Sequence, residues 1–329
     1  MIDQSICSEF TGKKVVVTGG TGLIGRQVVE KLCHAGARVV CVSLDEVVTD
    51  PRAEKIFADL TDFAVCREIT ENADFACHIA GIKGSVDVTR SKPASFFVPL
   101  LMMNTNFLEA CRLNSVGKVV FTSSIGAYGA AEYFDEENDS MDQPPMDKFP
   151  GWAKRIAELQ VAAYFQQYGT ENIAVVRPSN VYGPGDNFDP NNAMVIPTLI
   201  HRIASGENPV TIWGDGSAIR DFAYSADVAE GILLALHYGT RESFVNLGSG
   251  KECSIAELVE TFHTFLDFNH SFDTSKPSGF PRRVMDMSRA RDWIKYQPAT
   301  SLRDGLEATY NWYLEHRKEG EGRKNYFRE

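Results

Sequence analysis

Several classes of protein are excluded by what this 329-residue sequence lacks. Basic residues are too few for a protein whose main partner is nucleic acid, because 33 Lys and Arg face 44 Asp and Glu, a formal net charge of −11. No stretch approaches the roughly 20 consecutive apolar residues that a membrane-spanning helix needs. The first residues, MIDQSICSEFTGKK, contain no apolar run of the signal-peptide type. We therefore expect a soluble cytoplasmic protein with neither nucleic-acid nor membrane partners.

Cysteine is also scarce. Seven cysteines in a chain of this length do not make a disulfide scaffold, and no Cys-x-x-Cys or His/Cys pairing indicates a metal site. Cys33, Cys41, Cys77 and Cys111 occur in apolar surroundings, which is typical of small core residues. The sequence therefore predicts neither disulfides nor a bound metal.

What the sequence does contain is an alternation of strands and helices. Residues 13–36 read as a strand, a glycine turn and a helix, because the apolar run VVVTG is followed by apolar residues at helical spacing. Later segments continue the pattern: strands are predicted at 37–45, 74–81, 117–124 and 172–185, and helices at 100–114 and 152–169. Such alternation is typical of a parallel sheet covered by helices on both faces.

The pattern loosens in the second half of the chain. Residues 183–218 look rich in loops, and two further helices are predicted at 254–266 and 302–316. We predict an α/β fold in which residues 1–178 and 219–247 form a doubly wound parallel sheet. Residues 179–218 and 248–329 would form a smaller C-terminal lobe that binds the substrate.

The turn TGGTGLIG places glycines at 19, 22 and 25. Gly19 permits a tight turn after the strand, Gly22 lets the backbone approach a pyrophosphate, and Gly25 lets helix and strand pack closely. A glycine turn can also be purely structural. Its position between a strand and an amphipathic helix nevertheless favours a dinucleotide site of the Rossmann type.

The G-x-x-G-x-x-G spacing resembles that of the extended short-chain dehydrogenase/reductases, the NAD-dependent epimerase/dehydratase family. Two segments support the resemblance, ADLTD at 58–62 and HIAG at 78–81. Asp59 would hold the adenine, although a helix cap or turn is the alternative for this residue. Beside the three glycines, the resemblance implies cofactor contacts from Leu23, Ile24, Ser43, Asp59, Leu60, Ala80, Gly81, Lys154 and Pro178.

The choice of cofactor depends on the end of the second strand, CVSLDE. Ser43 occupies the position at which NAD-binding sites usually place a carboxylate, and Asp45 lies two residues further on. No Arg or Lys occurs at 42–46 to hold the 2′-phosphate of NADP. We therefore expect NAD, with NADP still possible.

A catalytic segment, VVFTSSIGAYG, follows the strand at 117–124. The resemblance assigns the substrate-binding hydroxyl to Ser124 and the lysine that holds the nicotinamide ribose to Lys154. In the family a tyrosine four residues before that lysine exchanges a proton with the substrate. Pro150 occupies its place here, and Phe149 precedes it.

The second half resembles the GDP-L-fucose synthase type of sugar-nucleotide epimerases and reductases. Three segments carry this resemblance, at 177–203, 213–232 and 276–290. It implies that a nucleotide diphosphate sugar is bound by Asn180, Arg202, Trp213, Arg220 and Lys276. Arginine suits phosphates because it presents a planar fork of donors.

The sequence also departs from that type. The cysteine and histidine that exchange protons at sugar carbons are replaced by Gly126 and Gly185, and no acidic pair follows the serine segment. Double epimerisation and 4,6-dehydration are therefore disfavoured. What remains is oxidoreduction or epimerisation at C4 of a sugar, GDP-linked in our prediction.

Three hypotheses address the missing tyrosine. Tyr133 or Tyr128 could carry the proton instead. Alternatively, Ser124 and water could support a slower reaction. Lastly, the protein could bind cofactor and sugar nucleotide without turnover.

The resemblance also implies a homodimer formed through long helices. In the helix at 152–169, one face carries Ile156, Leu159, Ala163 and Gln167 and the neighbouring face carries Ala157, Val161 and Tyr164. One face could cover the sheet while the other contacts a partner subunit.

Overall fold

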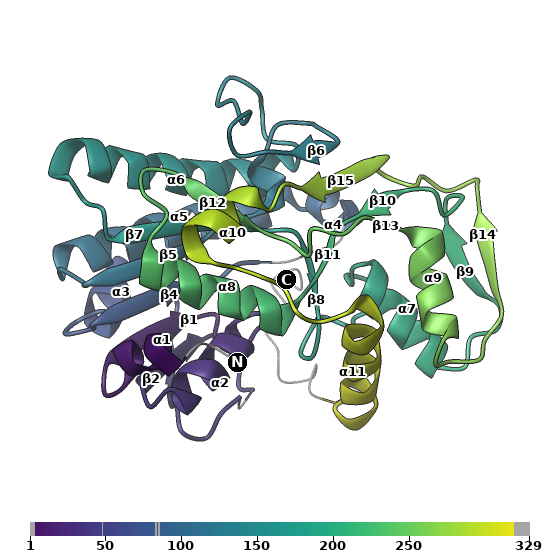
Figure 1. The fold of residues 1–329 in the computed structure, drawn as a ribbon, viewed down its shortest axis with the longest axis horizontal. Coiled ribbons are helices and arrows are strands. Elements are labelled where there is room, and N and C mark those ends of the chain that lie inside the picture. The colour runs from purple at the N-terminus through teal and green to yellow at the C-terminus, as the bar shows by residue number, and fades with distance from the viewer. Residues whose placement is uncertain (1–3, 48, 83, 85, 319–329) are drawn as a thin grey trace.

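The computed structural model describes residues 4–47, 49–82, 84 and 86–318, and its centre is a seven-stranded sheet (Figure 1). All neighbouring strands in this sheet are parallel, which confirms the doubly wound fold. The strands lie in the order β3 (Glu54–Phe57), β2 (Arg38–Ser43), β1 (Lys14–Thr18), β4 (Phe75–His78), β5 (Lys118–Thr122), β7 (Ile173–Pro178) and β12 (Phe244–Leu247). The chain reverses its direction of winding between β1 and β4, where such sheets bind ligands beyond the carboxyl ends of the strands.

Helices cover both faces of the sheet. One face carries α1 (Gln4–Phe10), α2 (Gly25–His34), α8 (Ser225–Tyr238) and α10 (Ser288–Ile294). The other carries α3 (Phe63–Ile69), α4 (Val86–Ser91), α5 (Pro93–Leu113) and α6 (Lys148–Tyr168). Side chains alternate along each strand, so Val15 and Val17 pack on the first face and Val16 on the second.

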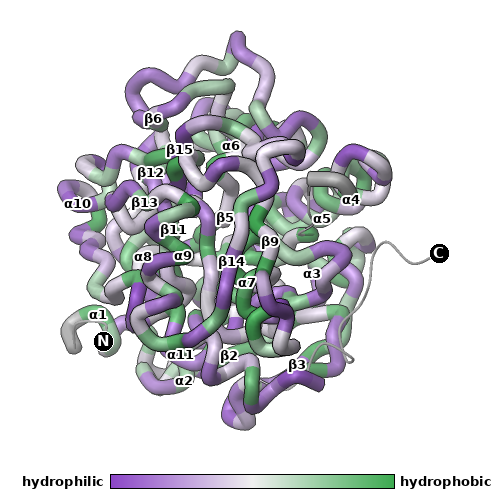
Figure 2. Tube along the Cα trace, turned by 90° about the vertical axis from the view of Figure 1, so that its right-hand side faces the viewer, coloured by the Kyte–Doolittle hydropathy of each residue, from purple (hydrophilic) through white to green (hydrophobic). Residues whose placement is uncertain are grey.

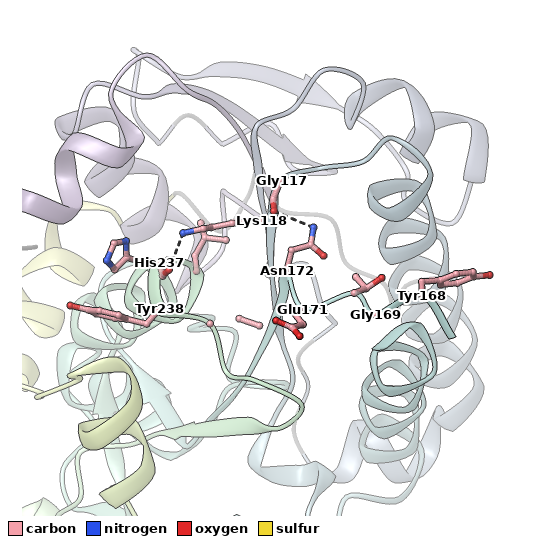
Figure 3. A pocket seen from close by; sticks show the side chains of 12 residues that line it. Gly117, Lys118, Tyr168, Gly169, Glu171, Asn172, His237 and Tyr238 are labelled. Carbon is pink, nitrogen blue, oxygen red and sulfur yellow. Dashed lines mark hydrogen bonds between the residues drawn. The ribbon is translucent and has the colours of Figure 1, made fainter. Parts of the chain in front are cut away.

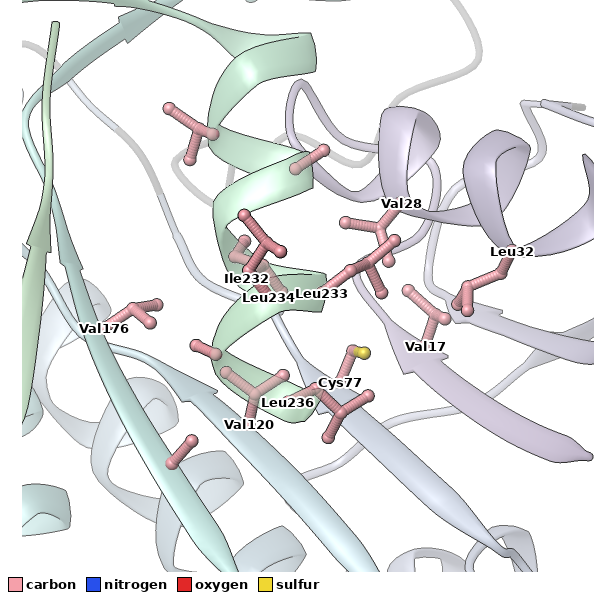
Figure 4. Packing of buried hydrophobic residues seen from close by; sticks show 14 of the residues in the cluster. Val17, Val28, Leu32, Cys77, Val120, Val176, Ile232, Leu233, Leu234 and Leu236 are labelled. Atoms are coloured by element: carbon pink, nitrogen blue, oxygen red, sulfur yellow. The ribbon is translucent and has the colours of Figure 1, made fainter. Parts of the chain in front are cut away.

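The core on the first face is built largely by α8. Its Ile232, Leu233 and Leu236 belong to the same buried cluster as Val120 and Val176 of the sheet, and Leu233 points toward Val28 of α2 (Figure 4). The four cysteines predicted to be core residues are buried, as expected: Cys33, Cys41, Cys77 and Cys111.

Helix α6 confirms the helix predicted at 152–169 and begins four residues earlier, at Lys148. It ends at Gly169, which adopts a left-handed conformation with φ of 65°. Pro150 therefore lies inside the first helical turn, where proline is tolerated because no intrahelical partner awaits its missing N–H.

The C-terminal region has a separate hydrophobic core. Its helices are α7 (Val195–Ala204), α9 (Ile255–His263) and α11 (Leu302–Glu315), and its strands include β9 (Val210–Trp213) and β14 (His270–Asp273). Short strands link this region to the sheet: β6 (Tyr133–Phe134), β8 (Asn180–Tyr182), β10 (Ile219–Arg220), β11 (Phe222–Tyr224), β13 (Cys253–Ser254) and β15 (Arg282–Met285).

The segment 183–218 is more ordered than its sequence indicated, because it contains α7 and β9. Ile196, Leu199 and Ile200 of α7 are buried, and much of α7 has the hydrophobic colour in Figure 2. Strand β9 pairs with β14, about sixty residues further along the chain, since Val210 is in register with His270. A strand of only four residues whose partner is so distant in the sequence is difficult to recognise from the local sequence pattern.

Candidate active site

The glycine turn forms a cradle that only glycine can build. Gly19 has φ of 68°, and a Cβ there would lie 2.8 Å from the backbone of Ala80. A Cβ on Gly25 would lie 2.1 Å from the carbonyl oxygen of Gly19, whereas one on Gly22 would meet only that oxygen, at 3.3 Å. The loop is thus closed at Gly19 and Gly25 and open at Gly22, beside the start of α2, which fits a pyrophosphate.

The carboxylate of Asp45 reaches this loop although it lies two residues beyond the usual position. The hydroxyl of Thr21 lies 2.6 Å from that of Ser43 and donates a hydrogen bond of 3.1 Å to Asp45 Oδ2. The amide of Asp45 in turn donates to Ser43 Oγ at 3.0 Å. A carboxylate in this place suits the ribose hydroxyls of NAD and repels the 2′-phosphate of NADP.

The other predicted cofactor residues gather beyond the carboxyl ends of β1, β3, β4 and β7. Asp59 forms a turn, since its Oδ1 accepts hydrogen bonds from the amide and hydroxyl of Thr61 at 2.9 and 2.8 Å. The amide of Ala80 donates to Thr18 Oγ1 at 3.2 Å. Leu23 and Leu60 are buried, Ile24 precedes α2, and Pro178 is the last residue of β7.

A cavity of about 100 Å³ brings the predicted catalytic residues together with the cofactor site. Ser124 from the end of β5 and Lys154 from α6 share it with Gly81 from the end of β4. Its walls are formed by Gly81, Ile82, Leu100, Ser124, Gly126, Asp147, Pro150, Gly151 and Lys154. Residues separated by more than seventy positions therefore meet at the edge of the sheet where the winding reverses.

Lys154 is held firmly on the cavity wall. Its Nζ donates a hydrogen bond of 2.7 Å to the carbonyl oxygen of Thr122 and lies 4.9 Å from the ring centroid of Phe121. A Cβ placed on Gly81 would lie 3.9 Å from Nζ, so the ammonium group faces the cofactor side of the cavity. Burial disfavours the charged form and lowers the pKa of Lys154 to about 8.

Ser124 both caps a turn of the backbone and lines the cavity. Its Oγ accepts a hydrogen bond of 3.0 Å from the amide of Gly126 and caps the 3₁₀ turn Ile125–Ala127. It therefore forms a turn and also lines the cavity. Accepting this bond leaves its hydroxyl proton available for donation to a substrate oxygen.

The two tyrosines considered as substitutes lie outside the cavity walls. Tyr128 is buried, donates to Asn246 Oδ1 at 2.9 Å, and has a pKa raised well above its usual value by burial. Tyr133 donates to Asp286 Oδ2 at 2.7 Å, where β6 pairs with β15. Neither tyrosine is among the residues that line the cavity of Ser124 and Lys154, whereas Pro150 is.

Sequence reasoning missed one polar residue of the cavity, Asp147. It directly precedes α6, and its Oδ1 lies 3.2 Å from Nη2 of Arg283 in β15. Its Oδ2 lies 2.3 Å from the point at which a Cβ of Gly126 would stand. The available signal was its spacing of seven residues from Lys154, which corresponds to two helical turns.

Both glycines at the proton-carrying positions face charged side chains. A Cβ on Gly126 would collide with Asp147, and one on Gly185 would lie 2.2 Å from Nε of Arg26. Gly185 also has φ of 80°. A cysteine or histidine could enter these positions only if its neighbours moved.

Three of the predicted sugar-nucleotide residues meet at the segment 276–280, because Lys276 belongs to it and Trp213 and Arg220 contact it. Nζ of Lys276 lies 5.7 Å from the ring centroid of Trp213. Nη1 of Arg220 donates to the carbonyl oxygen of Phe280 at 2.8 Å. Burial, together with the charge of Arg283, lowers the pKa of Arg220 to about 10.

The remaining two predicted residues lie on neighbouring elements. Arg202 of α7 forms an ion pair with Glu207 and donates to the carbonyl oxygen of Thr211 in β9. Nδ2 of Asn180 in β8 donates to the carbonyl oxygen of Asp221 at 3.1 Å.

A wider hollow of about 580 Å³ lies at the opposite, amino-terminal edge of the sheet (Figure 3). In it Lys118 Nζ donates to the carbonyl oxygen of His237 at 2.9 Å, and Asn172 Nδ2 to that of Gly117 at 3.1 Å. None of the predicted site residues lines this hollow.

Among the described residues, no group of three or more His, Cys, Asp or Glu side chains could hold a metal ion. No helix in the described part of the chain is long and apolar enough to cross a membrane.

Comparison with known proteins agrees with this geometry. The model of the NAD-dependent epimerase/dehydratase family matches residues 15–248. A probable GDP-L-fucose synthase from Oryza sativa subsp. japonica is 32% identical, over 92% of this chain and 93% of that protein. A dTDP-4-dehydro-6-deoxy-D-allose reductase from Streptomyces is 30% identical, over 94% and 98%.

A solved structure extends the comparison. UDP-glucose 4-epimerase from Thermotoga maritima, crystallised with UDP-glucose, superimposes with a TM-score of 0.80 at 25% identity, covering 93% of this chain and 100% of that one. The chain therefore belongs to the NAD-dependent epimerase/dehydratase family of nucleotide-sugar enzymes, and its cofactor is NAD.

Proposed function

We propose that the protein transfers a hydride at C4 of a GDP-linked sugar and acts as an oxidoreductase or C4 epimerase. One observation carries this proposal: Ser124 and Lys154 share a cavity with Gly81 at the cofactor edge of the sheet. A hydroxyl donor, a cation and a cofactor-side backbone in one cavity are the parts that hydride transfer to a sugar carbon requires.

Each residue has a role in this proposal. NAD, when bound, supplies the hydride acceptor or donor. The open glycine loop binds the pyrophosphate, and Asp45 binds the adenosine ribose. Lys154 holds the nicotinamide ribose, and Ser124 donates a hydrogen bond to the substrate oxygen at C4.

Chemistry at a single carbon is supported by the two glycines that stand at the proton-exchanging positions of double epimerisation. Gly126 and Gly185 cannot carry protons, and Asp147 and Arg26 occupy the space beside them. Two of the related proteins have names that specify carbon 4, a 4-dehydro-sugar reductase and a 4-epimerase.

The nucleotide diphosphate would lie against the segment 276–280. Trp213 is 53% exposed and offers a flat surface to a base or ribose, with Lys276 beside it. Arg220 supplies a guanidinium for phosphate, and Arg202 and Asn180 would complete the site. Guanine is proposed because the related plant protein is named a probable GDP-L-fucose synthase.

The test is a panel of GDP-, dTDP- and UDP-sugars, including 4-keto forms, incubated with purified protein and NAD or NADH. We expect a change in nicotinamide absorbance, or a C4 epimer detected by NMR, with a GDP-linked sugar. Absence of both products with every member of the panel would refute the proposed reaction.

A second candidate is a binding protein without turnover, favoured by Pro150 in place of the tyrosine. Calorimetry separates the two candidates. Binding of both NAD and a sugar nucleotide, without any product, identifies the binding protein.

We also propose a homodimer formed by α5 and α6. Val98 and Met102 of α5 and Leu159 of α6 are 50%, 42% and 48% exposed in the single chain. Ala157 and Tyr164 of α6 are buried, so the two predicted faces of this helix differ in burial.

A further inference from the structure

The proposed function leaves the proton of the reaction without a carrier. Among the described residues that line the cavity, only Ser124, Asp147 and Lys154 have side chains that can exchange protons, and only Asp147 is an acid. We propose that Asp147 is the proton carrier and exchanges a proton with the substrate oxygen at the carbon that undergoes hydride transfer. This inference rests on the proposed function.

The start of α6 explains why the Asp147 carboxylate faces the cavity. An aspartate before a helix usually accepts a hydrogen bond from the second or third helical amide. Here the third helical residue is Pro150, which has no N–H, and the Asp147 side chain makes no capping bond. The residue that replaces the tyrosine therefore also removes a donor that would draw the carboxylate back onto the helix.

Gly126 explains where the carboxylate goes. Any side chain at position 126 would stand 2.3 Å from Asp147 Oδ2, so the carboxylate uses space that glycine leaves. The amide of Asp147 also donates to the carbonyl oxygen of Gly126 at 3.3 Å. The carboxylate and the Ser124 hydroxyl are thereby fixed on the same turn, Ile125–Ala127, whose cap is Ser124.

Arg283 hydrogen-bonds one carboxylate oxygen of Asp147 and not the other. Its Nη2 lies 3.2 Å from Oδ1, while Oδ2 lies against Gly126, which also lines the cavity. A guanidinium on one oxygen orients the carboxylate and leaves the other oxygen for the substrate. The departures at Pro150 and Gly126, which look unrelated in sequence, thus form one arrangement with Asp147.

The proton and the electrons balance as follows for alcohol oxidation. The O–H bond of the sugar hydroxyl breaks and its proton moves to Asp147 Oδ2, while the C4–H bond breaks and its electron pair leaves as hydride to oxidised nicotinamide. The electrons of the O–H bond form the second bond of the C4 carbonyl. Ketone reduction is the reverse, and Asp147 regains its starting state by proton exchange with water.

The experiment compares Asp147→Asn and Asp147→Ala with Asp142→Asn, a control at an exposed carboxylate outside the cavity walls. We expect kcat on the sugar nucleotide to fall by about 10²–10⁴-fold in both Asp147 variants and to stay unchanged in the control. Calorimetric affinities for NAD and sugar nucleotide should stay within about twofold of wild type. Added formate should restore part of the activity of Asp147→Ala, because a small carboxylate can enter the vacated space.

A double variant provides a second line of evidence if removal of the carboxylate perturbs the helix start. Pro150→Tyr combined with Asp147→Asn returns a hydroxyl four residues before Lys154, and we expect it to recover turnover lost in Asp147→Asn. A structural role for Asp147 predicts neither formate rescue nor recovery in the double variant, and failure of both overturns the inference.

The outcomes separate this inference from the proposed function. Wild-type activity that survives in Asp147→Asn overturns the proton role and leaves the function intact. A wild type that binds both ligands without turnover overturns the proton role and identifies the binding protein. A wild type that binds neither ligand refutes both proposals.

Discussion

Because Lys154 is buried in the cavity wall, we expect cofactor binding to depend on pH. Its ammonium donates to the carbonyl oxygen of Thr122 beside the ring of Phe121. Burial lowers its pKa to about 8, so the charged form dominates below pH 8 and the neutral form above it. Cofactor binding that depends on this charge should therefore weaken at alkaline pH.

We predict that the affinity for NAD falls as the pH rises through about 8. Calorimetry on either side of pH 8 measures it. Lys154→Arg should lose this dependence, because guanidinium stays charged throughout that range. An affinity that is flat across pH 8 in the wild type would show that the ammonium does not hold the cofactor.

Substitutions at Gly22 and Gly25 should distinguish the role of the glycine loop in folding from its role in binding NAD. A methyl group at Gly22 would meet only one atom, at 3.3 Å, whereas one at Gly25 would collide with the backbone at 2.1 Å. We predict that Gly22→Ala keeps its melting temperature and loses NAD affinity by at least tenfold. Gly25→Ala should lose both. Unchanged NAD affinity in Gly22→Ala would move the pyrophosphate site elsewhere.

The family resemblance assigned Ser124 and Lys154 to one site, and both residues line the same cavity. Asp147 escaped this reasoning. Its place in the cavity depends on a missing amide at Pro150 and a missing side chain at Gly126, and neither absence is visible as a pattern around Asp147. The missing amide and the missing side chain affect Asp147 through contacts in three dimensions, and these contacts become visible only in the structure.

At the scale of elements, a buried ionic network fastens α6 to the sheet. Arg177 of β7 is fully buried and pairs with Glu158 of α6 at 2.6 Å and with Asp139 at 2.9 Å. Arg155, equally buried, pairs with the same Asp139 at 3.1 Å. The network joins β7, α6 and the loop before α6, and so supports the helix that carries Lys154 and follows Asp147.

We predict that Arg177→Met destabilises the protein by about 3–5 kcal/mol, because two carboxylates lose a buried partner. The matched control is Arg303→Met, which removes an exposed pair with Glu307 and should cost about 0–1 kcal/mol. Urea denaturation measures both. If both variants lost equally little free energy of unfolding, water would be solvating the carboxylates that Arg177 leaves unpaired.

For the whole molecule, the sheet was more predictable than the C-terminal lobe. Strands β1, β4 and β5 are short buried runs followed by turns, and their order follows from helices that alternate with them. The pairing of β9 with β14 joins residues about sixty positions apart. In the same way, Ala290 and Ile294 of α10 pack into the core on one face of the sheet rather than the C-terminal core. Such distant contacts leave no periodic signal.

The last prediction concerns assembly. Exposed apolar side chains at Val98, Met102 and Leu159 lie on adjacent helices, since α5 packs along α6. An apolar surface formed by two parallel or antiparallel helices can pair with its own copy about a two-fold axis, which buries both surfaces at once. We therefore expect light scattering to give the mass of a dimer at micromolar concentration.

Charge placed on this surface should dissociate the dimer without unfolding the chain. We predict that Met102→Glu combined with Leu159→Glu gives a monomer whose circular dichroism matches the wild type. Leu314→Glu is the control, because Leu314 is 41% exposed on α11, outside the proposed interface, and its substitution should leave the dimer intact. A wild-type monomer would refute the interface. A dimer that resists the double substitution but dissociates in Leu314→Glu would move the interface to the C-terminal lobe.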